Sequence, residues 1–481
     1  MKDFTTGSIP KQLAFFAAPI VLGDMLQSVY SIIDAIWVGR LIGPNALAAV
    51  SASMPLVFFL VSFVIGLAAA TVILVGQAYG AKKMDFLAKV LSNSLITTTI
   101  LCVVITVLSI TFANPLLHLL NTPPEIQKDA HTFFIIIIGG ICLTFFFNWF
   151  SGVLRGMGDS KTPLMLLSIS VGLNIILVPF LIKGIGPIPP LGIAGSALAT
   201  VISNFVAVLI AVFYVLKTNT FFKTFKWDFT VDWQIIKKMF GLGIPISLSM
   251  IVVSLSAVLI VSLVNKFGVS VTAAYGIGLR IDQFSFLPAM STGLAVSSMV
   301  AQNLGAGKKE RVPEILKWAL IISLSFGTFF FILVNIFPTF IAQAFTKDAI
   351  VAAEAVKYFK IVSFTYFTFA IMFAFQGVVR GAGDTVTMFL ITAFSILIFR
   401  VPLAYGLAEH TGLKERGIWF GMLFSAGLAV ILNIIYYFTG RWKNKVVITR
   451  QGPPSKLEEC TPEDNQKTCE QTETQLPGST Q

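Results

Sequence analysis

The sequence predicts an all-α integral membrane protein with twelve transmembrane helices in two parallel six-helix repeats. Of its 481 residues, 56% are hydrophobic and 12% are charged, whereas soluble domains are about half apolar and about a quarter charged. The apolar residues form runs of the roughly 20 residues that span a bilayer as a helix. Alternating strands of about ten residues, which a membrane barrel needs, are not seen. Motifs of the first half recur 225 residues later.

Twelve apolar runs are separated by short breaks that are charged or rich in Pro and Gly. Some runs exceed the thickness of a membrane, so we expect protruding ends or tilted helices. The predicted spans are 13–38, 46–79, 88–113, 131–153, 163–183, 191–216, 238–265, 271–304, 316–338, 355–379, 386–408 and 416–440.

The distribution of Lys and Arg predicts the orientation. With both termini in the cytoplasm, the cytoplasmic segments carry 21 of these residues and the opposite loops carry 9. Cytoplasmic loops are enriched in positive charge, so this arrangement is favoured. We therefore expect a multi-pass protein of the cell membrane with both termini cytoplasmic. The same topology accounts for the net charge of +11 without a nucleic-acid partner.

The predicted organisation has four parts. Residues 1–216 form an N-terminal lobe, 217–237 a basic cytoplasmic linker, and 238–440 a C-terminal lobe. Residues 441–481 form a cytoplasmic tail that is rich in Gln, Thr, Pro and acidic residues from 451 onward, a composition typical of disorder. We interpret the tail as a solubilising extension.

The internal repeat keeps one register across four separate segments. Since an offset of 225 residues contains six spans, both halves have the same orientation, and an axis along the membrane normal relates them. Halves of this kind enclose a central cleft and indicate transport by alternating access. The matching pairs are Gly43/Gly268, Ala48/Ala273, Ala49/Ala274, Gln77/Gln302, Gly80/Gly305, Ala81/Ala306, Gly152/Gly377, Arg155/Arg380, Gly156/Gly381, Gly158/Gly383, Asp159/Asp384, Gly192/Gly417 and Ile193/Ile418.

A GxxRGxGD motif follows the fourth span of each half. Its glycines permit a tight turn and close helix approach. Arg155 and Asp159 are four residues apart and suited to pairing, as are Arg380 and Asp384. We interpret both motifs as structural turns at the cytoplasmic surface.

The first span carries a polar stripe. Asp24, Gln27, Ser31 and Asp34 fall within an arc of about 80° on a helix. Charges inside a span are costly and usually functional, so the stripe should line a cavity or pack against partners. In the second half the matching positions of the two acids are Ser249 and Leu259. The acidic stripe is therefore specific to the first half, and it predicts a site for cation coupling.

Other polar residues are candidates for the same site or for a second one. Asn174 lies in the fifth span, and Ser196, Thr200, Ser203 and Asn204 share a face of the sixth. With Asp34 these side chains offer oxygen ligands for Na⁺ or a hydrogen-bond network for H⁺; the alternative is that they join helices. Secondary candidates in the second half are Arg280, Asp282 and Arg400, the first two on different faces of one helix.

At these residues the sequence resembles the multidrug and toxic compound extrusion (MATE) family. The resemblance covers about 13–440. It lies in 34–49 (DAIWVGRLIGPNALAA), 76–81 (GQAYGA), 152–163 (GVLRGMGDSKTP) and 192–200 (GIAGSALAT), and in the second-half copies AQNLGAGKK and GVVRGAGD. It implies a twelve-helix, two-lobe antiporter that exports small, mostly cationic amphipathic compounds. It also implies that Asp34 is the coupling carboxylate, with Asn174 and Thr200 beside it.

Two departures from the family pattern affect the choice of ion. Val178 stands where members with an N-lobe cation site often carry a second Asp. The spans 238–265 and 355–379 lack the membrane-embedded acids of other members. Asp34 is left as the principal candidate, with Asp24 and Gln27 behind it. A single carboxylate favours H⁺ over Na⁺, although a Na⁺ site near Asp34 stays open.

Alternative functions are less well supported. A lipid-linked oligosaccharide flippase of a related fold would need a strongly basic cleft, and few basic residues lie within the spans. An enzyme would need a catalytic constellation, but His118, His131 and His410 lie near span ends without metal-ligand spacing. We expect a monomer in the lipid bilayer that is not an enzyme, has no cofactor and carries small molecules.

Overall fold

The computed structural model describes residues 2–120, 122–184, 189–217 and 227–448. Helices account for nearly all of these residues. The first half contains α1 (Ile9–Leu41), α2 (Pro44–Gly80), α3 (Met84–Thr111), α4 (Ala113–Leu119), α5 (Pro124–Gly139), α6 (Ile141–Gly156), α7 (Lys161–Lys183) and α8 (Ile193–Lys217).

The second half follows the same order. It contains α10 (Trp233–Asn265), α11 (Val269–Gly305), η1 (Lys309–Arg311), α12 (Val312–Ile336), α13 (Pro338–Phe345), α14 (Ala349–Val362), α15 (Thr365–Ala382), α16 (Thr385–Thr392), η2 (Ala393–Phe399), α17 (Arg400–Glu409), α18 (Glu415–Thr439) and η3 (Arg441–Asn444).

The predicted twelve spans are confirmed, and each bound lies within seven residues of the expected one. Ten are continuous, and two are bent pairs: α5 with α6 at 43° and α14 with α15 at 44°. The sequence predicts each pair as a single span, because the apolar run continues through each bend. Gly140 ends α5, whereas at the second bend the Ser363 hydroxyl accepts a hydrogen bond of 3.0 Å from Asn335 of α12.

The two halves match in structure as well as in sequence. Helices α2 and α11 each have 37 residues, α1 and α10 each have 33, and both bends interrupt the fourth span of their half. The predicted parallel six-helix repeats are therefore present in the fold.

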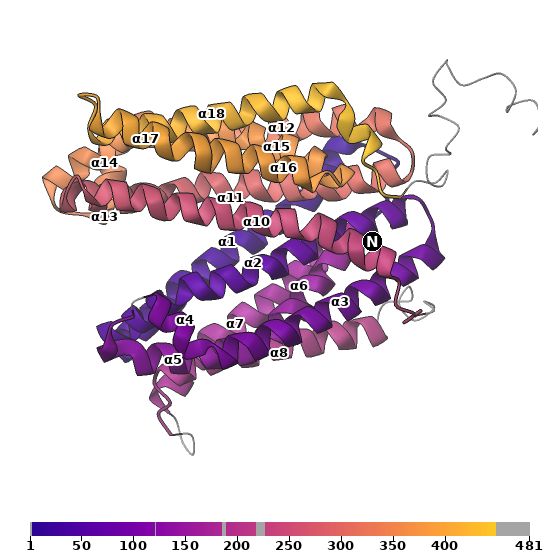
Figure 1. Cartoon of the computed structure of the whole chain (residues 1–481), viewed down its shortest axis with the longest axis horizontal. Coiled ribbons are helices and arrows are strands. Elements are labelled where there is room, and N and C mark those ends of the chain that lie inside the picture. The colour runs from indigo at the N-terminus through magenta and orange to yellow at the C-terminus, as the bar shows by residue number, and fades with distance from the viewer. Residues whose placement is uncertain (1, 121, 185–188, 218–226, 449–481) are drawn as a thin grey trace, which may run out of the picture.

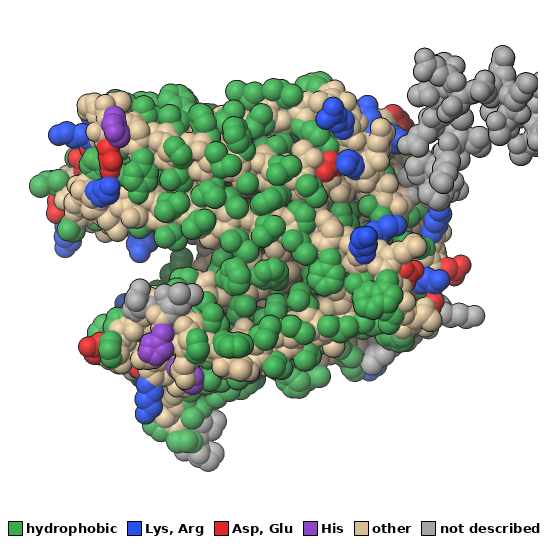
Figure 2. Space-filling view, viewed as in Figure 1, with side chains coloured by type: hydrophobic (Ala, Val, Ile, Leu, Met, Phe, Trp, Pro, Cys, Tyr) green, Lys and Arg blue, Asp and Glu red, His purple; other side chains and the backbone are tan. Residues whose placement is uncertain are grey.

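The halves form two lobes that meet at one end and diverge at the other. In Figure 1 they spread toward the left, and Figure 2 shows an open cleft between them on that side. Figure 2 also shows apolar side chains over the middle of the molecule and charged side chains toward its ends, as a membrane-spanning protein requires. We call the right-hand side of these views, where the described chain begins and ends, the closed end.

At the closed end the apolar core is continuous between the lobes. Leu67 and Leu74 of α2 belong to one cluster with Met239, Leu242 and Ile246 of α10. Glycines allow the two longest helices to cross in direct contact. A Cβ on Gly80 of α2 would lie 2.0 Å from the carbonyl oxygen of Gln302, and a Cβ on Gly305 of α11 would lie 2.1 Å from that of Gln77.

The repeated glutamines Gln77 and Gln302 join the lobes at this crossing. Gln302 Nε2 donates to the carbonyl of Gly156 at 2.8 Å, and Gln77 Nε2 donates to the carbonyl of Gly381 at 3.1 Å. Gly156 and Gly381 are themselves a matching pair in opposite lobes. Each lobe therefore holds the other through one buried side-chain amide.

The ends of the chain complete these contacts. The oxygen of the Gln302 amide accepts from Phe4 N at 3.0 Å, and that of Gln77 accepts from Val447 N and Ile448 N at 3.0 and 3.1 Å. The prediction of a disordered tail from residue 441 is therefore wrong for its first eight residues. Trp442 is buried against the second lobe, and Val447 and Ile448 pack at the closed end. Residues 449–481 lie outside the described chain.

The predicted linker also ends earlier than expected. Helix α10 begins at Trp233, where the Asp232 side chain accepts from two backbone amides of the first turn. Asp232 N in turn donates to Asn93 Oδ1 of α3 at 2.8 Å, so the start of the second half is fixed on the first. Of the predicted linker, 218–226 lie outside the described residues.

Candidate functional site in the first lobe

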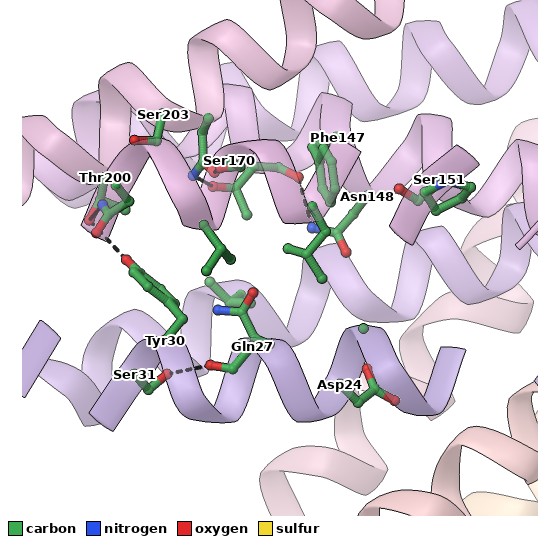
Figure 3. Close-up of a pocket in the computed structure, with 18 of the residues that line it drawn as sticks. Asp24, Gln27, Tyr30, Ser31, Phe147, Asn148, Ser151, Ser170, Thr200 and Ser203 are labelled. Atoms are coloured by element: carbon green, nitrogen blue, oxygen red, sulfur yellow. Dashed lines mark hydrogen bonds between the residues drawn. The ribbon is translucent and has the colours of Figure 1, made fainter. Parts of the chain in front are cut away.

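Six helices of the first lobe surround a cavity of about 730 Å³, a size typical of small-molecule sites. Its lining residues come from α1, α2, α5, α6, α7 and α8, with Ser160 between α6 and α7. The only charged side chains among them are Asp24, Asp34 and Arg155. Figure 3 shows the polar residues of α1 on one side of this cavity and those of α6, α7 and α8 on the other.

The polar stripe of α1 lies on the cavity as predicted. Asp24, Gln27, Ser31 and Asp34 all line it. Near Asp24 the helix runs close to α7, since a Cβ on Gly23 would contact Leu167 at 3.5 Å. The two carboxylates are ten residues apart, about 15 Å along the helix, so they cannot share one ion.

Asp34 lies in the half of α1 nearer the open end and contacts α8. Its Oδ1 accepts a hydrogen bond from Ser196 Oγ at 3.3 Å, and the side chain is partly buried. A membrane-embedded carboxylate held by a single neutral donor keeps acceptor capacity for a proton, an ion or a cationic ligand.

Thr200 joins three helices beside this carboxylate. Its hydroxyl accepts a hydrogen bond of 3.2 Å from Asn174 Nδ2 of α7 and lies 3.1 Å from the hydroxyl of Tyr30 of α1. The structure thus brings the predicted Asn174 and Thr200 together, one helical turn from Ser196. Neither makes a direct hydrogen bond to Asp34 among the described contacts. Tyr30 was not predicted; its position three residues after Gln27, on the edge of the stripe, was the available signal.

A second polar chain lies further from Asp34. Ser170 Oγ donates to Asn204 Oδ1 at 3.2 Å, and Asn204 Nδ2 donates to Thr144 Oγ1 at 3.3 Å. Ser203 also lines the cavity, and its buried hydroxyl has no hydrogen-bond partner among the described residues. The polar face predicted for the sixth span is therefore directed into the first lobe.

Val178 is fully buried in an apolar cluster with Val38, Leu181 and Ile193. Position 178, where the family resemblance led us to look for a second carboxylate, is therefore part of the packing between helices. Within the described chain, no group of three or more His, Cys, Asp and Glu side chains is arranged to hold a metal. An ion at Asp34 would be bound by this carboxylate and by neutral oxygens such as those of Ser196 and Thr200.

Asp24 connects the cavity to the other lobe. Its Oδ2 accepts a hydrogen bond of 2.5 Å from Ser291 Oγ of α11. It is the only cavity-lining carboxylate with a described hydrogen bond to the second lobe, so it can respond to movement between the lobes.

The two repeated loop motifs differ from their prediction. Both aspartates accept hydrogen bonds at a helix start: Asp159 accepts from the backbone of Lys161 and Thr162 at the start of α7, and Asp384 caps α16. The ion pairs that the four-residue spacing would allow with Arg155 and Arg380 are not formed within the described chain. The capping geometry is the reason, because it aims each carboxylate forward along the chain and away from the arginine. Arg155 instead lines the cavity.

The secondary candidates of the second lobe lie apart from this cavity. Asp282 is buried and accepts from Tyr358 at 2.5 Å and from Tyr366 at 2.8 Å. Arg400 donates through Nε to Ser425 at 2.8 Å and follows the π-helical segment η2, while Arg280 is exposed. The expectation that Arg280 and Asp282 face different directions is confirmed.

A known protein family matches the chain twice. The family model described as MatE matches residues 19–180 and again 245–406, one match in each half. The chain belongs to the MATE family. The two matches also confirm the internal repeat independently of the motifs.

Full-length relatives of this MATE protein support the assignment. It is 34% identical over 444 residues to the probable multidrug resistance protein YoeA of Bacillus subtilis strain 168, covering 92% of this chain and 96% of that one. It is 33% identical over 451 residues to YpnP of the same organism, which bears the same description, covering 93% and 99%. The family is one of multidrug efflux transporters, so the predicted transport function is supported at that level.

Solved structures share the fold. An outward-facing multidrug resistance MATE family transporter of the MOP superfamily superposes with a TM-score of 0.86 at 24% identity, covering 92% of this chain and 99% of that one. A MATE protein in a bent conformation gives 0.84 at 23% identity, covering 91% and 96%.

Proposed function

We propose that the protein is a secondary antiporter that exports small, mostly cationic amphipathic compounds in exchange for H⁺. The observation that carries the proposal is the position of Asp34. It is a carboxylate inside the membrane-spanning region, on the wall of a cavity of ligand size, held by the single hydroxyl of Ser196. Such a group can bind a proton and a cationic ligand in turn, which couples the two fluxes.

The lining of the cavity supports the substrate class. Phe58, Phe133, Phe147 and Tyr30 provide aromatic faces, and Asp24 and Asp34 outnumber the single basic residue, Arg155. Aromatic rings and carboxylates together favour a flat organic cation. A lipid-linked oligosaccharide flippase is not favoured, because a pyrophosphate would need several basic groups in this space.

The choice of H⁺ over Na⁺ follows from the ligands near Asp34. With Val178 in the apolar packing, Asp34 is the one carboxylate at its end of the cavity. A hard cation is bound by several oxygen ligands, and the absence of a second carboxylate lowers the charge of such a ligand set, whereas one carboxylate suffices for a proton.

The closed end would face the cytoplasm of the cell, with both termini inside, in agreement with the Lys and Arg count. With this orientation, the side of the molecule that holds the cavity faces the exterior. Conversion to the opposite conformation requires Gln77 and Gln302 to separate from their partners in the other lobe. A monomer suffices, since every residue of the proposed site comes from one chain.

The proposal is tested by dye efflux from proteoliposomes with an imposed ΔpH or ΔNa⁺. We expect the wild type to move dye when ΔpH alone is imposed, and Asp34→Asn to lose this coupling. Asp348→Asn is a matched control, since Asp348 caps α14 away from the cavity and Asn caps helices about as well. Normal transport by Asp34→Asn would contradict the assignment, and flux driven by ΔNa⁺ at zero ΔpH would contradict the choice of ion.

A further inference from the structure

The side of α6 that faces the cavity carries three polar residues, and two of them have a buried polar atom without a hydrogen-bond partner among the described residues. Asn148, Ser151 and Arg155 are spaced i, i+3 and i+7, so they share one helical face, and all three line the cavity. Figure 3 shows Asn148 and Ser151 on the same helix, opposite Asp24. Ser151 Oγ and Arg155 Nε are enclosed, and neither has a hydrogen-bond partner among the described residues. Ser151 is only 3% exposed.

A guanidinium whose Nε is enclosed in the protein favours an anionic partner, because a buried charge is costly unless it is paired and hydrogen-bonded. The two nearby carboxylates are engaged elsewhere. Asp159, four residues on, accepts from Lys161 N and from the backbone and hydroxyl of Thr162. Asp24 is the acid whose charge acts on Arg155, yet it accepts the 2.5 Å bond from Ser291 and lies beyond ion-pair distance of the guanidinium.

The matching face in the second lobe is built differently. The positions that correspond to Asn148 and Ser151 are Phe373 and Gln376. The corresponding arginine, Arg380, donates through Nη2 to Met388 Sδ at 3.8 Å. The Nε of Arg380 also lacks a hydrogen-bond partner among the described residues, but Arg380 is not among the residues that line the first-lobe cavity. The position of Arg155 on this cavity, beside Asn148 and Ser151, is therefore what distinguishes the first lobe.

We propose that Arg155, with Ser151 beside it, binds an anionic group of the transported compound, a carboxylate or a phosphate. A guanidinium and a hydroxyl on one helical face match two oxygens of such a group. The opposite wall offers Asp34 for a cationic group, so the cavity is suited to zwitterions. The inference rests on the proposed export function and narrows its substrates to compounds that carry an anion beside their cation.

The test uses two dyes that differ at one group. Rhodamine 110 carries a free carboxylate, and rhodamine 123 is its methyl ester, with the same cationic ring system. Binding of each dye to the purified full-length protein in lipid nanodiscs is measured at neutral pH by fluorescence anisotropy. The readout is the ratio of the two affinities in one preparation, which is independent of the fraction of active protein.

We expect Arg155→Gln to lower the affinity for rhodamine 110 relative to rhodamine 123 about tenfold, about 1.4 kcal/mol. Arg155→Lys should retain part of the preference, because it keeps the charge and loses the planar fork. Arg380→Gln is the matched control and should leave the ratio unchanged.

An unchanged ratio in Arg155→Gln, an equal change in Arg380→Gln, or a wild type that does not bind rhodamine 110 would each overturn the inference. Its failure is distinguishable from failure of the proposed export function. The latter is measured as gradient-driven flux, and the former as equilibrium binding without a gradient.

Discussion

Replacement of Gly80 by alanine tests whether the glycine crossing holds the lobes together at the closed end. The added Cβ would lie 2.0 Å from the carbonyl oxygen of Gln302, a backbone atom that cannot rotate away, and real Cβ atoms essentially never approach within 3.0 Å. Helices α2 and α11 must therefore separate by at least about 1 Å. Overpacking of this kind costs about 1–3 kcal/mol.

This cost applies only to the conformation in which the helices cross. A state with the closed end open has no such contact, so the substitution shifts the equilibrium toward that state by the whole cost. At about 2 kcal/mol the shift in the equilibrium constant is about thirtyfold. Gly305→Ala should act in the same way, because its Cβ would lie 2.1 Å from the carbonyl oxygen of Gln77.

The assay is a spin-label distance measurement at the closed end. Met84 and Lys309 are exposed, matching positions in the two lobes, and labels there report their separation after the four cysteines are replaced. We expect Gly80→Ala to increase the population with the longer distance. Gly241→Ala is the control, since a Cβ there meets no atom within 4 Å. A folded Gly80→Ala protein with the same distance distribution as wild type would refute the reasoning.

Two further predictions concern stability. Tyr358→Phe removes the 2.5 Å hydrogen bond to the buried Asp282 and should lower the free energy of unfolding by about 1.5–3 kcal/mol, measured as a lower melting temperature; an unchanged melting temperature would show that the bond contributes little. At the N-terminus, partial burial acts to raise the pKa of Asp3, but hydrogen bonds from the hydroxyl and amide of Thr5 outweigh it and lower the pKa. Its stabilising effect is therefore present above the unfolded pKa of about 3.9 and is lost as pH falls through the lower folded value. The melting-temperature difference between wild type and Asp3→Asn should shrink in that acidic range, and a difference that grows there would contradict the assignment.

The sequence was sufficient for the spans and for the repeat, because both depend on patterns along the chain. Hydrophobic run length set the twelve spans, and the fixed offset set the relation of the lobes. The α1 stripe could be predicted for the same reason, since Asp24 and Asp34 lie on one helix and its period places them on one face. Ser196, the partner of Asp34, was among the candidates on the sixth span. Ser291, the partner of Asp24, could not be assigned, because it belongs to α11 in the other lobe.

The features that were missed depend on contacts between distant segments. In the sequence Tyr30 resembles an ordinary residue of an apolar helix, because its hydroxyl contacts Thr200, which lies 170 residues later in the chain. The loop arginine Arg155 was interpreted with Asp159, its neighbour in sequence, although capping directs that carboxylate elsewhere. The tail was judged by its composition beyond residue 451, which gave no indication that 441–448 are packed.

Segments near both termini hydrogen-bond to the glutamine pair, and this constrains the order in which the fold is completed during synthesis. Gln77 is synthesised early, yet the two backbone amides that satisfy its side-chain oxygen, those of Val447 and Ile448, follow 370 and 371 residues later. Until these two residues are synthesised and in place, the side-chain oxygen of Gln77, a buried acceptor between the lobes, lacks these two donors. The junction can therefore be completed only after both lobes have been synthesised, and a chain that stops short of residue 447 leaves the buried Gln77 oxygen without these two donors.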